Sequence, residues 1–451
     1  MLQKMQLVRG VGISAALAFA VVMSGCGKKD SVTNNAPSAL FQFGQANFND
    51  TLTNRNGISS KASLAGATSV ASNIKTVGGV TTGVFLIADT GNNRILGFKQ
   101  VPTSATTAAD FVYGQDSMDT NVRSDLLNQP SKISFSKDGT QLLVVDSGNN
   151  RVLVWKANLP AFTGTAQANI NVIAPPNNVI GNGSATVSSA SLSGPTGASF
   201  APTTLLPNRL AVADKGNHRV LIYDDYTAIA DATTVLLGQR LFADGPTTPN
   251  CPQNPSSVPD CTVGTGLYPY ADTLRSPTDV WSDGSSLLIS DTGNNRVLYF
   301  TSVPAIKGQA PMRALAATNV IGQSSLVGVR GPNVGQAGLN QPQSLWVDPN
   351  TKIIYVADFS NNRVLGFSKP QVDGQNAIFL YGQGDYSHIT ADDDDQNGLT
   401  DHPSNNNSLN YASARTLFNP SGMTTVALPS GSIQLFIADT GNNRLTAYNT
   451  N

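Results

Sequence analysis

The sequence has no glutamate among its 451 residues, so all 29 acidic residues are aspartates. Glutamate favours helices, whereas aspartate favours turns, and the 41 glycines and 25 prolines add further turn positions. The composition therefore predicts many short strands joined by turns. Charged residues make up only 13% of the chain, with a formal net charge of −1. This balance excludes the basic surface that a nucleic-acid-binding protein requires.

Histidine and cysteine, which supply many metal sites and nucleophiles, occur only three times each. His218 falls in a repeated phrase, where we expect a structural role. His388 and His402 lie in a polar stretch, where simple exposure to solvent and a share in a metal site both remain open. Cys251 and Cys261 lie in a proline-rich stretch, and we expect them to form a disulfide if the protein is exported.

Residues 1–25 have the features of a targeting segment. Lys4 and Arg9 precede an apolar stretch, residues 11–22, that is too short to span a bilayer. It ends in Met-Ser-Gly-Cys at residues 23–26, which resembles the lipobox of bacterial lipoproteins. The resemblance implies cleavage before Cys26 and a lipid anchor there, facing the cell envelope, at the outer membrane in a Gram-negative cell. The alternative is an ordinary signal peptide with a chance cysteine.

One eleven-residue phrase occurs six times, first as ADTGNNRILGF at residues 88–98. Each copy is preceded by an apolar run that often follows a proline, and is followed by a run ending in Gly-Gln or Gly-Asn. Each unit thus has four runs of strand length, A to D, in which the phrase supplies B, a turn and C. Four antiparallel strands repeated six times predict an all-β, six-bladed β-propeller.

The pattern of a proline, an apolar run and VAD-x-GN-(N/H)-RV resembles the NHL repeat over about residues 40–451. The resemblance implies a monomeric interaction platform, here with a propeller at residues 39–451 and a tether at residues 26–38. Ala67 replaces the proline in the first copy, and Ser360 replaces the glycine in the fifth. A spare Phe-Gly-Gln run precedes the first unit, while the chain stops after the sixth C run. We therefore expect residues 41–45 to pair beside residues 445–449 and close the ring.

Each phrase contains an aspartate and, five residues later, an arginine. These residues are Asp89 and Arg94, Asp146 and Arg151, Asp214 and Arg219, Asp291 and Arg296, Asp358 and Arg363, and Asp439 and Arg444. Six equivalent positions around a ring cannot converge on one reaction centre. We expect them to hold turns or neighbouring blades together by charge-assisted hydrogen bonds, and we expect the Gly-Asn turn to need positive φ angles.

Function should lie where the repeats differ. The longest insertions are both D–A connections, at residues 240–275 and 384–418, so they rise from one face of the ring and form our candidate binding surface. Passive insertion in tolerant loops is the alternative. The second insert contains D-x-D-x-N-G-x-x-D, which resembles the calcium loops of thrombospondin type-3 and dockerin-like modules. The implied ligands are Asp393, Asp395, Asn397, the Leu399 carbonyl and Asp401; a solvated acidic run is the alternative.

Two classes of function follow from this pattern. The first is a lipid-anchored binding scaffold for a protein or carbohydrate partner. The second is an enzyme that uses the propeller channel, either a calcium-dependent hydrolase or lactonase or a lyase; NHL-like lyases with a His-bound metal are disfavoured by the scarcity of histidine. Trp281 and Trp346 fall in A strands near the axis, where ligand stacking and core packing are both open. Asp279 and Asp283 flank the fourth A strand without marking a catalytic set.

Overall fold

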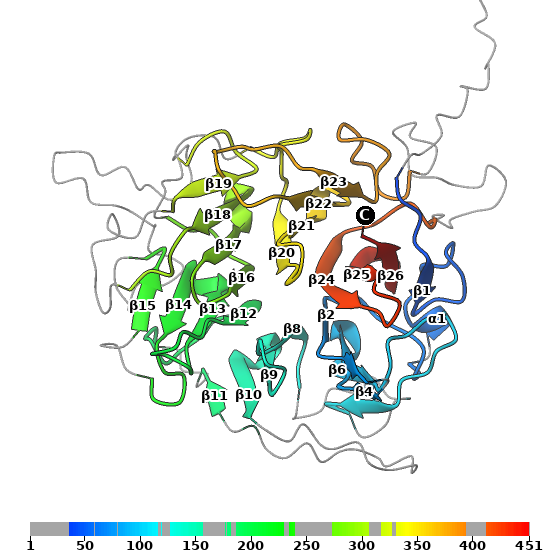
Figure 1. Ribbon diagram of the computed structural model, residues 1–451, viewed down its shortest axis with the longest axis horizontal. Coiled ribbons are helices and arrows are strands. Elements are labelled where there is room, and N and C mark those ends of the chain that lie inside the picture. Colours follow the sequence, from blue (N-terminus) through cyan, green and yellow to red (C-terminus); the bar gives the residue numbers. More distant parts are fainter. Residues whose placement is uncertain are drawn as a thin grey trace, which may run out of the picture.

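The computed structural model describes residues 36–57, 59–78, 80–115, 119, 127–156, 176, 178–181, 186–229, 234–239, 273–305, 317–326, 331–393 and 412–450. Six four-stranded antiparallel sheets, which we number as blades one to six in chain order, surround a central axis (Figure 1). This arrangement is the predicted all-β, six-bladed propeller.

From the axis outward, the strands of each blade are: in blade one, β2 (Ser69–Ser72), β5 (Phe85–Asp89), β6 (Arg94–Phe98) and β7 (Phe111–Tyr113); in blade two, β8 (Pro130–Phe135), β9 (Gln141–Asp146), β10 (Arg151–Lys156) and β11 (Asn178–Ile180); in blade three, β12 (Gly197–Phe200), β13 (Leu210–Asp214), β14 (Arg219–Tyr223) and β15 (Thr234–Leu237); in blade four, β16 (Asp279–Ser282), β17 (Leu287–Asp291), β18 (Arg296–Phe300) and β19 (Asn319–Ile321); in blade five, β20 (Pro342–Val347), β21 (Ile354–Asp358), β22 (Arg363–Phe367) and β23 (Phe379–Tyr381); and in blade six, β24 (Pro420–Ala427), β25 (Ile433–Asp439), β26 (Arg444–Asn449) and β1 (Phe41–Phe43). A one-turn helix, α1 (Asn54–Gly57), and a hairpin, β3 (Lys75–Val77) with β4 (Val80–Thr82), lie outside the blades. No helix in the described ranges is both long and apolar enough to cross a membrane.

The first strand of the chain completes the last blade. β1 pairs antiparallel with β26, with Phe41 opposite Ala447 and Phe43 opposite Leu445. The Phe43 side chain is fully buried, and its ring meets the Phe98 ring of blade one edge-on at 5.2 Å. The predicted closure of the ring is confirmed, and it leaves β26 without an open edge.

Apolar packing fills the junctions between blades. Each cluster of buried apolar side chains joins residues of two neighbouring blades, as Val220 of blade three and Ile289 of blade four do in one of them. Corresponding clusters occupy the five other junctions around the ring. The hydrophobic core is therefore a ring of inter-blade layers, and the stability of each blade depends on both neighbours.

The turn inside each phrase is a short 3-10 segment, and it corrects our expectation about its glycine. In blade one this segment is Thr90–Asn92, and the residue with positive φ is the next one, Asn93, at 53°. Gly91 does not have positive φ. It approaches the Ala65 carbonyl so closely that a Cβ atom would lie 2.7 Å from the Ala65 oxygen. The glycine is needed for this close approach, and the asparagine supplies the left-handed conformation.

Blade five shows the cost of replacing that glycine. The backbone N–H at this position donates to the chain just before the A strand over 2.8–2.9 Å in the five blades that have glycine. In blade five, where Ser360 stands, the corresponding distance to the Asn340 oxygen is 3.2 Å. The added side chain therefore loosens the turn without abolishing its hydrogen bond. We call the face that carries these six turns, each starting one residue after the phrase aspartate, the turn face.

The left-handed residue of each turn also links its blade to the next one. Its side-chain acceptor takes a hydrogen bond from a backbone N–H at the start of the following A strand. These contacts are Asn93 with Gln129, Asn150 with Gly194, His218 with Ser276, Asn295 with Gln341, Asn362 with Asn419, and Asn443 with Gly66. In blade three the acceptor is His218 Nδ1, at 2.8 Å, so the neutral ring carries its proton on Nε2. The expected structural role of His218 agrees with this contact.

His218 should make this blade junction sensitive to pH. Burial, followed by the charge of Arg275, lowers the pKa of His218, whereas Asp291 and Asp214 oppose that shift. A protonated Nδ1 cannot accept the Ser276 N–H. Because the folded-state pKa lies below the unfolded value of about 6.5, the contribution of His218 is present above that pH and is lost as the pH falls below it.

Replacing His218 with asparagine restores the residue of the five other blades and keeps the acceptor at every pH. We expect His218→Asn to match the wild type in urea unfolding at pH 7.5, and to exceed it by about 1 kcal/mol at pH 5.0. A His218→Asn variant that loses stability in parallel with the wild type between these pH values would contradict this role.

Candidate functional site

The aspartate and arginine of each phrase form a closed local network. In all six blades the arginine Nε donates to the aspartate Oδ2 over 2.7 Å. In blade one Asp89 Oδ1 accepts the Ala65 N–H at 2.7 Å, and the Arg94 guanidinium reaches the Ser60 and Ser63 carbonyls. Burial raises the pKa of Asp89, an effect that Arg94 opposes. Each set thus connects the B–C turn to the preceding D–A connection and leaves no carboxylate oxygen free for chemistry.

Several residues predicted to act in the inserts and at the N-terminus lie outside the described part of the chain. These are Cys26, Cys251, Cys261, Asp395, Asn397, Leu399, Asp401 and His402. Asp393 is described and is fully buried. His388 is described and partly exposed, with Nδ1 2.8 Å from Asp385 Oδ1. Among the described residues, no three His, Cys, Asp or Glu side chains gather into a metal site.

The clearest break in the sixfold pattern lies on the innermost strands. Strand pairing places one residue of each A strand next to the position before the phrase aspartate, as Asp279 lies opposite Ser290 and Lys132 opposite Val145. We call this level the channel ring. Its members are Ser69, Lys132, Gly197, Asp279, Ser344 and Gly422.

Lys132 and Asp279 form an ion pair across the channel ring, two blades apart. Lys132 Nζ lies 2.6 Å from Asp279 Oδ2, and it also donates to Ser344 Oγ at 3.3 Å and the Leu345 carbonyl at 3.5 Å. Asp279 Oδ2 accepts further hydrogen bonds from Ser344 Oγ at 2.8 Å and Leu345 N at 2.9 Å, and Oδ1 accepts from Val280 N. Both side chains are largely buried, at 12% and 2% exposure. The pair is therefore neutral overall, with its hydrogen-bonding groups already used.

Glycines in the channel ring let the inner strands come close. A Cβ at Gly197 would lie 2.5 Å from Asp279, and one at Gly422 would lie 2.4 Å from Ser69. Lys132 belongs to blade two and Asp279 to blade four, with Gly197 of blade three between them. The absence of a side chain at Gly197 leaves room for the lysine to reach the carboxylate.

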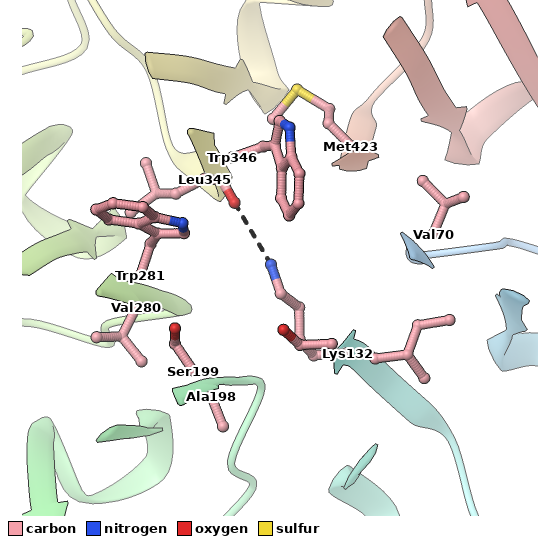
Figure 2. Close-up of a pocket in the computed structure, with 11 residues that line it drawn as sticks. Val70, Lys132, Ala198, Ser199, Val280, Trp281, Leu345, Trp346 and Met423 are labelled. Carbon is pink, nitrogen blue, oxygen red and sulfur yellow. Dashed lines mark hydrogen bonds between the residues drawn. The ribbon is translucent and has the colours of Figure 1, made fainter. Parts of the chain in front are cut away.

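Two tryptophans lie two residues further along their strands, toward the face opposite the turn face. Trp281 of β16 and Trp346 of β20 line the same pocket as Lys132 and Ser199, which encloses about 290 Å³ of atom-free space open to solvent (Figure 2). Both indoles are partly buried and pack against inter-blade clusters. Trp346 Nε1 donates to Thr425 Oγ1 of blade six at 2.9 Å. They combine core packing with a surface toward the channel, so the two interpretations of these residues are compatible.

A second break in the pattern lies in blade six. Asp392 is fully buried, and its Oδ1 accepts hydrogen bonds from Asn442 Nδ2 at 3.0 Å and Thr416 Oγ1 at 3.1 Å. Burial, together with the neighbouring carboxylate of Asp439, raises the pKa of Asp392 to about 6. The calcium motif in the sequence starts one residue later, so sequence reasoning missed Asp392.

No protein-family model and no curated protein sequence matches this chain. Among solved structures, it is similar to a structural genomics protein of unknown function from Bacteroides thetaiotaomicron VPI-5482, with 14% identity and a TM-score of 0.46 over 90% of this chain and 74% of the other. An auxiliary nutrient binding protein from the same organism matches at 12% identity and TM-score 0.43, over 85% and 69% of the two chains. A nidogen/laminin complex matches at 14% identity and TM-score 0.35, over 70% and 83%. Likenesses this distant carry no information about function.

Proposed function

We propose that this chain is an NHL-type propeller, anchored in the cell envelope through a lipid on Cys26, that binds a protein or carbohydrate partner. The observation that carries the proposal is the state of the channel ring. A general base or a metal ligand needs a lone pair that is available to the substrate or ion. Asp279 instead has its oxygens filled by Lys132, Ser344 and backbone N–H groups.

The alternative, a calcium-dependent hydrolase, lactonase or lyase in the channel, would need several unlike polar groups directed at one point. Among the described residues that line the pocket, Lys132 is the charged side chain, and it is already committed to Asp279. The arrangement suits a rigid ring that holds its blades at a fixed distance more than it suits a reaction centre.

Two parts of the molecule are suited to contact a partner. Trp281 and Trp346 present amphipathic rings beside the Ser134 and Ser199 hydroxyls, a combination of apolar face and polar group that fits a sugar or a peptide. The D–A inserts at residues 240–275 and 384–418 supply the other candidate surface, on the turn face. β1 begins opposite Ala447 and runs toward the turn face, so the chain from Cys26 enters the propeller from the opposite face.

The proposal is tested by capturing ligands with the purified chain, using immobilised polysaccharides and envelope proteins as probes, with and without calcium. We expect capture of one class, weakened about tenfold or more either by Trp281→Ala with Trp346→Ala or by shortening one insert. Trp155→Ala, in blade two and away from the pocket, is the matched control and should bind like the wild type. No capture, or capture that neither change affects, would contradict the proposal.

A further inference from the structure

Blade one contains a reciprocal pair of amides at the base of its turn. Asn54 Nδ2 donates to Asn92 Oδ1 at 2.9 Å, and Asn92 Nδ2 donates back to Asn54 Oδ1 at 2.7 Å. Ser63 Oγ donates to the same Asn54 oxygen at 3.3 Å. Asn54 has a left-handed backbone with φ of 52°, which fixes its side chain toward the turn. Every polar atom of this amide pair therefore has a partner.

Blade six has the same arrangement with one change, an aspartate in place of Asn54. Asp392 has the same φ of 52°, and its Oδ1 accepts from Asn442 and Thr416, the counterparts of Asn92 and Ser63. A carboxylate has no N–H to return to Asn442. Within the described part of the chain, Asp392 Oδ2 and Asn442 Oδ1 are both buried and have no hydrogen-bond partner.

The change also adds a buried negative charge. Asp392 is fully buried, while the nearby Arg444 guanidinium is already paired with Asp439 at 2.7 Å. A buried carboxylate without a counter-charge is strongly unfavourable. The two oxygens take the places of the Asn54 nitrogen and Asn92 oxygen, which lie 2.9 Å apart in blade one. Carboxylate and amide oxygens at such a spacing are the ligands that a hard divalent cation prefers.

We propose that Asp392 Oδ2 and Asn442 Oδ1 supply two oxygens of a binding site for a hard divalent cation, with calcium as the best-suited ion. Asn442 belongs to the turn of the blade that closes the ring, and Asp392 stands at the described end of the second insert. A bound cation joins the two and relieves the uncompensated charge. The inference goes beyond partner binding, because it makes the stability of the closing blade depend on a cation.

The test compares calcium binding and thermal unfolding of the purified chain in EDTA and in calcium at pH 7.5. We expect calcium to raise the melting temperature of the wild type by several degrees. Asp392→Asn recreates the amide pair of blade one, so it should melt higher than the wild type in EDTA. Isothermal titration should show calcium binding weakened about tenfold or more in this variant.

Two further variants make the result decisive. Asn54→Asp places the same unpaired oxygens in blade one and should lower the melting temperature with no recovery in calcium. Asp395→Asn alters the calcium loop predicted from the sequence alone. Calcium binding that is lost in Asp395→Asn and unchanged in Asp392→Asn would overturn the assignment to Asp392, as would a wild type that does not respond to calcium. Either result leaves the partner-capture experiment unaffected.

Discussion

Replacing Phe43 with alanine should lower the free energy of unfolding by about 3–5 kcal/mol, a large effect for one substitution near the end of a chain. Phe43 is fully buried between blades six and one, and it packs in one cluster with Phe98 and Leu445. Removing the ring leaves a cavity at the junction where the circle closes. Chemical denaturation followed by circular dichroism measures the loss.

Leu40→Ala is the matched control for this prediction. Leu40 lies three residues earlier in the same segment, and its side chain is 47% exposed. We expect a change within about 0.5 kcal/mol, because exposed apolar side chains contribute little to stability. Similar small effects of both substitutions would mean that β1 does not close the ring in solution.

Replacing Asp291 with asparagine should lower the free energy of unfolding by about 3–5 kcal/mol, because the variant leaves the Arg296 guanidinium buried without its counter-charge. Both side chains of this pair are fully buried, and their atoms are 2.7 Å apart. If the phrase is architecture, the folded variant should still capture its partner with the wild-type affinity. Loss of partner capture in a variant that is still folded at the assay temperature would show that the phrase has a direct role in function.

Asp146→Asn tests the same interaction where solvent reaches it. The Asp146–Arg151 pair has the same 2.7 Å distance, but the Arg151 side chain is 28% exposed. Water can solvate the unpaired guanidinium there, so we expect a smaller loss of about 2 kcal/mol. Equal losses in Asp146→Asn and Asp291→Asn would rule out burial of the arginine as the source of the difference.

The ring and its closure could be predicted from the sequence because both depend on repetition. Six copies of one phrase fix the number of blades, and the spare Phe-Gly-Gln run at residues 43–45 has a place only beside the sixth C strand. The role of the turn glycine was predicted wrongly. A tight turn indicates that some residue has positive φ, but only the packing of Gly91 against Ala65 shows that glycine is required for close approach.

The channel ring could not be predicted, because its members are unlike residues at equivalent positions. Lys132, Asp279 and Ser344 are far apart in sequence and belong to three blades. Aligning the A strands on the phrase would have placed them at one level, but the bulge between Pro342 and Leu345 shifts the register in blade five. Asp392 escaped notice for a different reason, since its partner Asn442 lies 50 residues away in the turn of blade six.

A disulfide between β1 and β26 tests the central claim most directly, which is that one chain closes a ring of six blades with its first strand. Gln42 lies opposite Thr446, at a cross-strand spacing that a disulfide can bridge. The measurement is mass spectrometry of peptides from Gln42→Cys with Thr446→Cys, made with Cys251 and Cys261 replaced by serine and oxidised mildly. The account predicts an intramolecular cross-link that joins the two ends of the propeller and raises its melting temperature. Cross-links only between two molecules, or none, would contradict it.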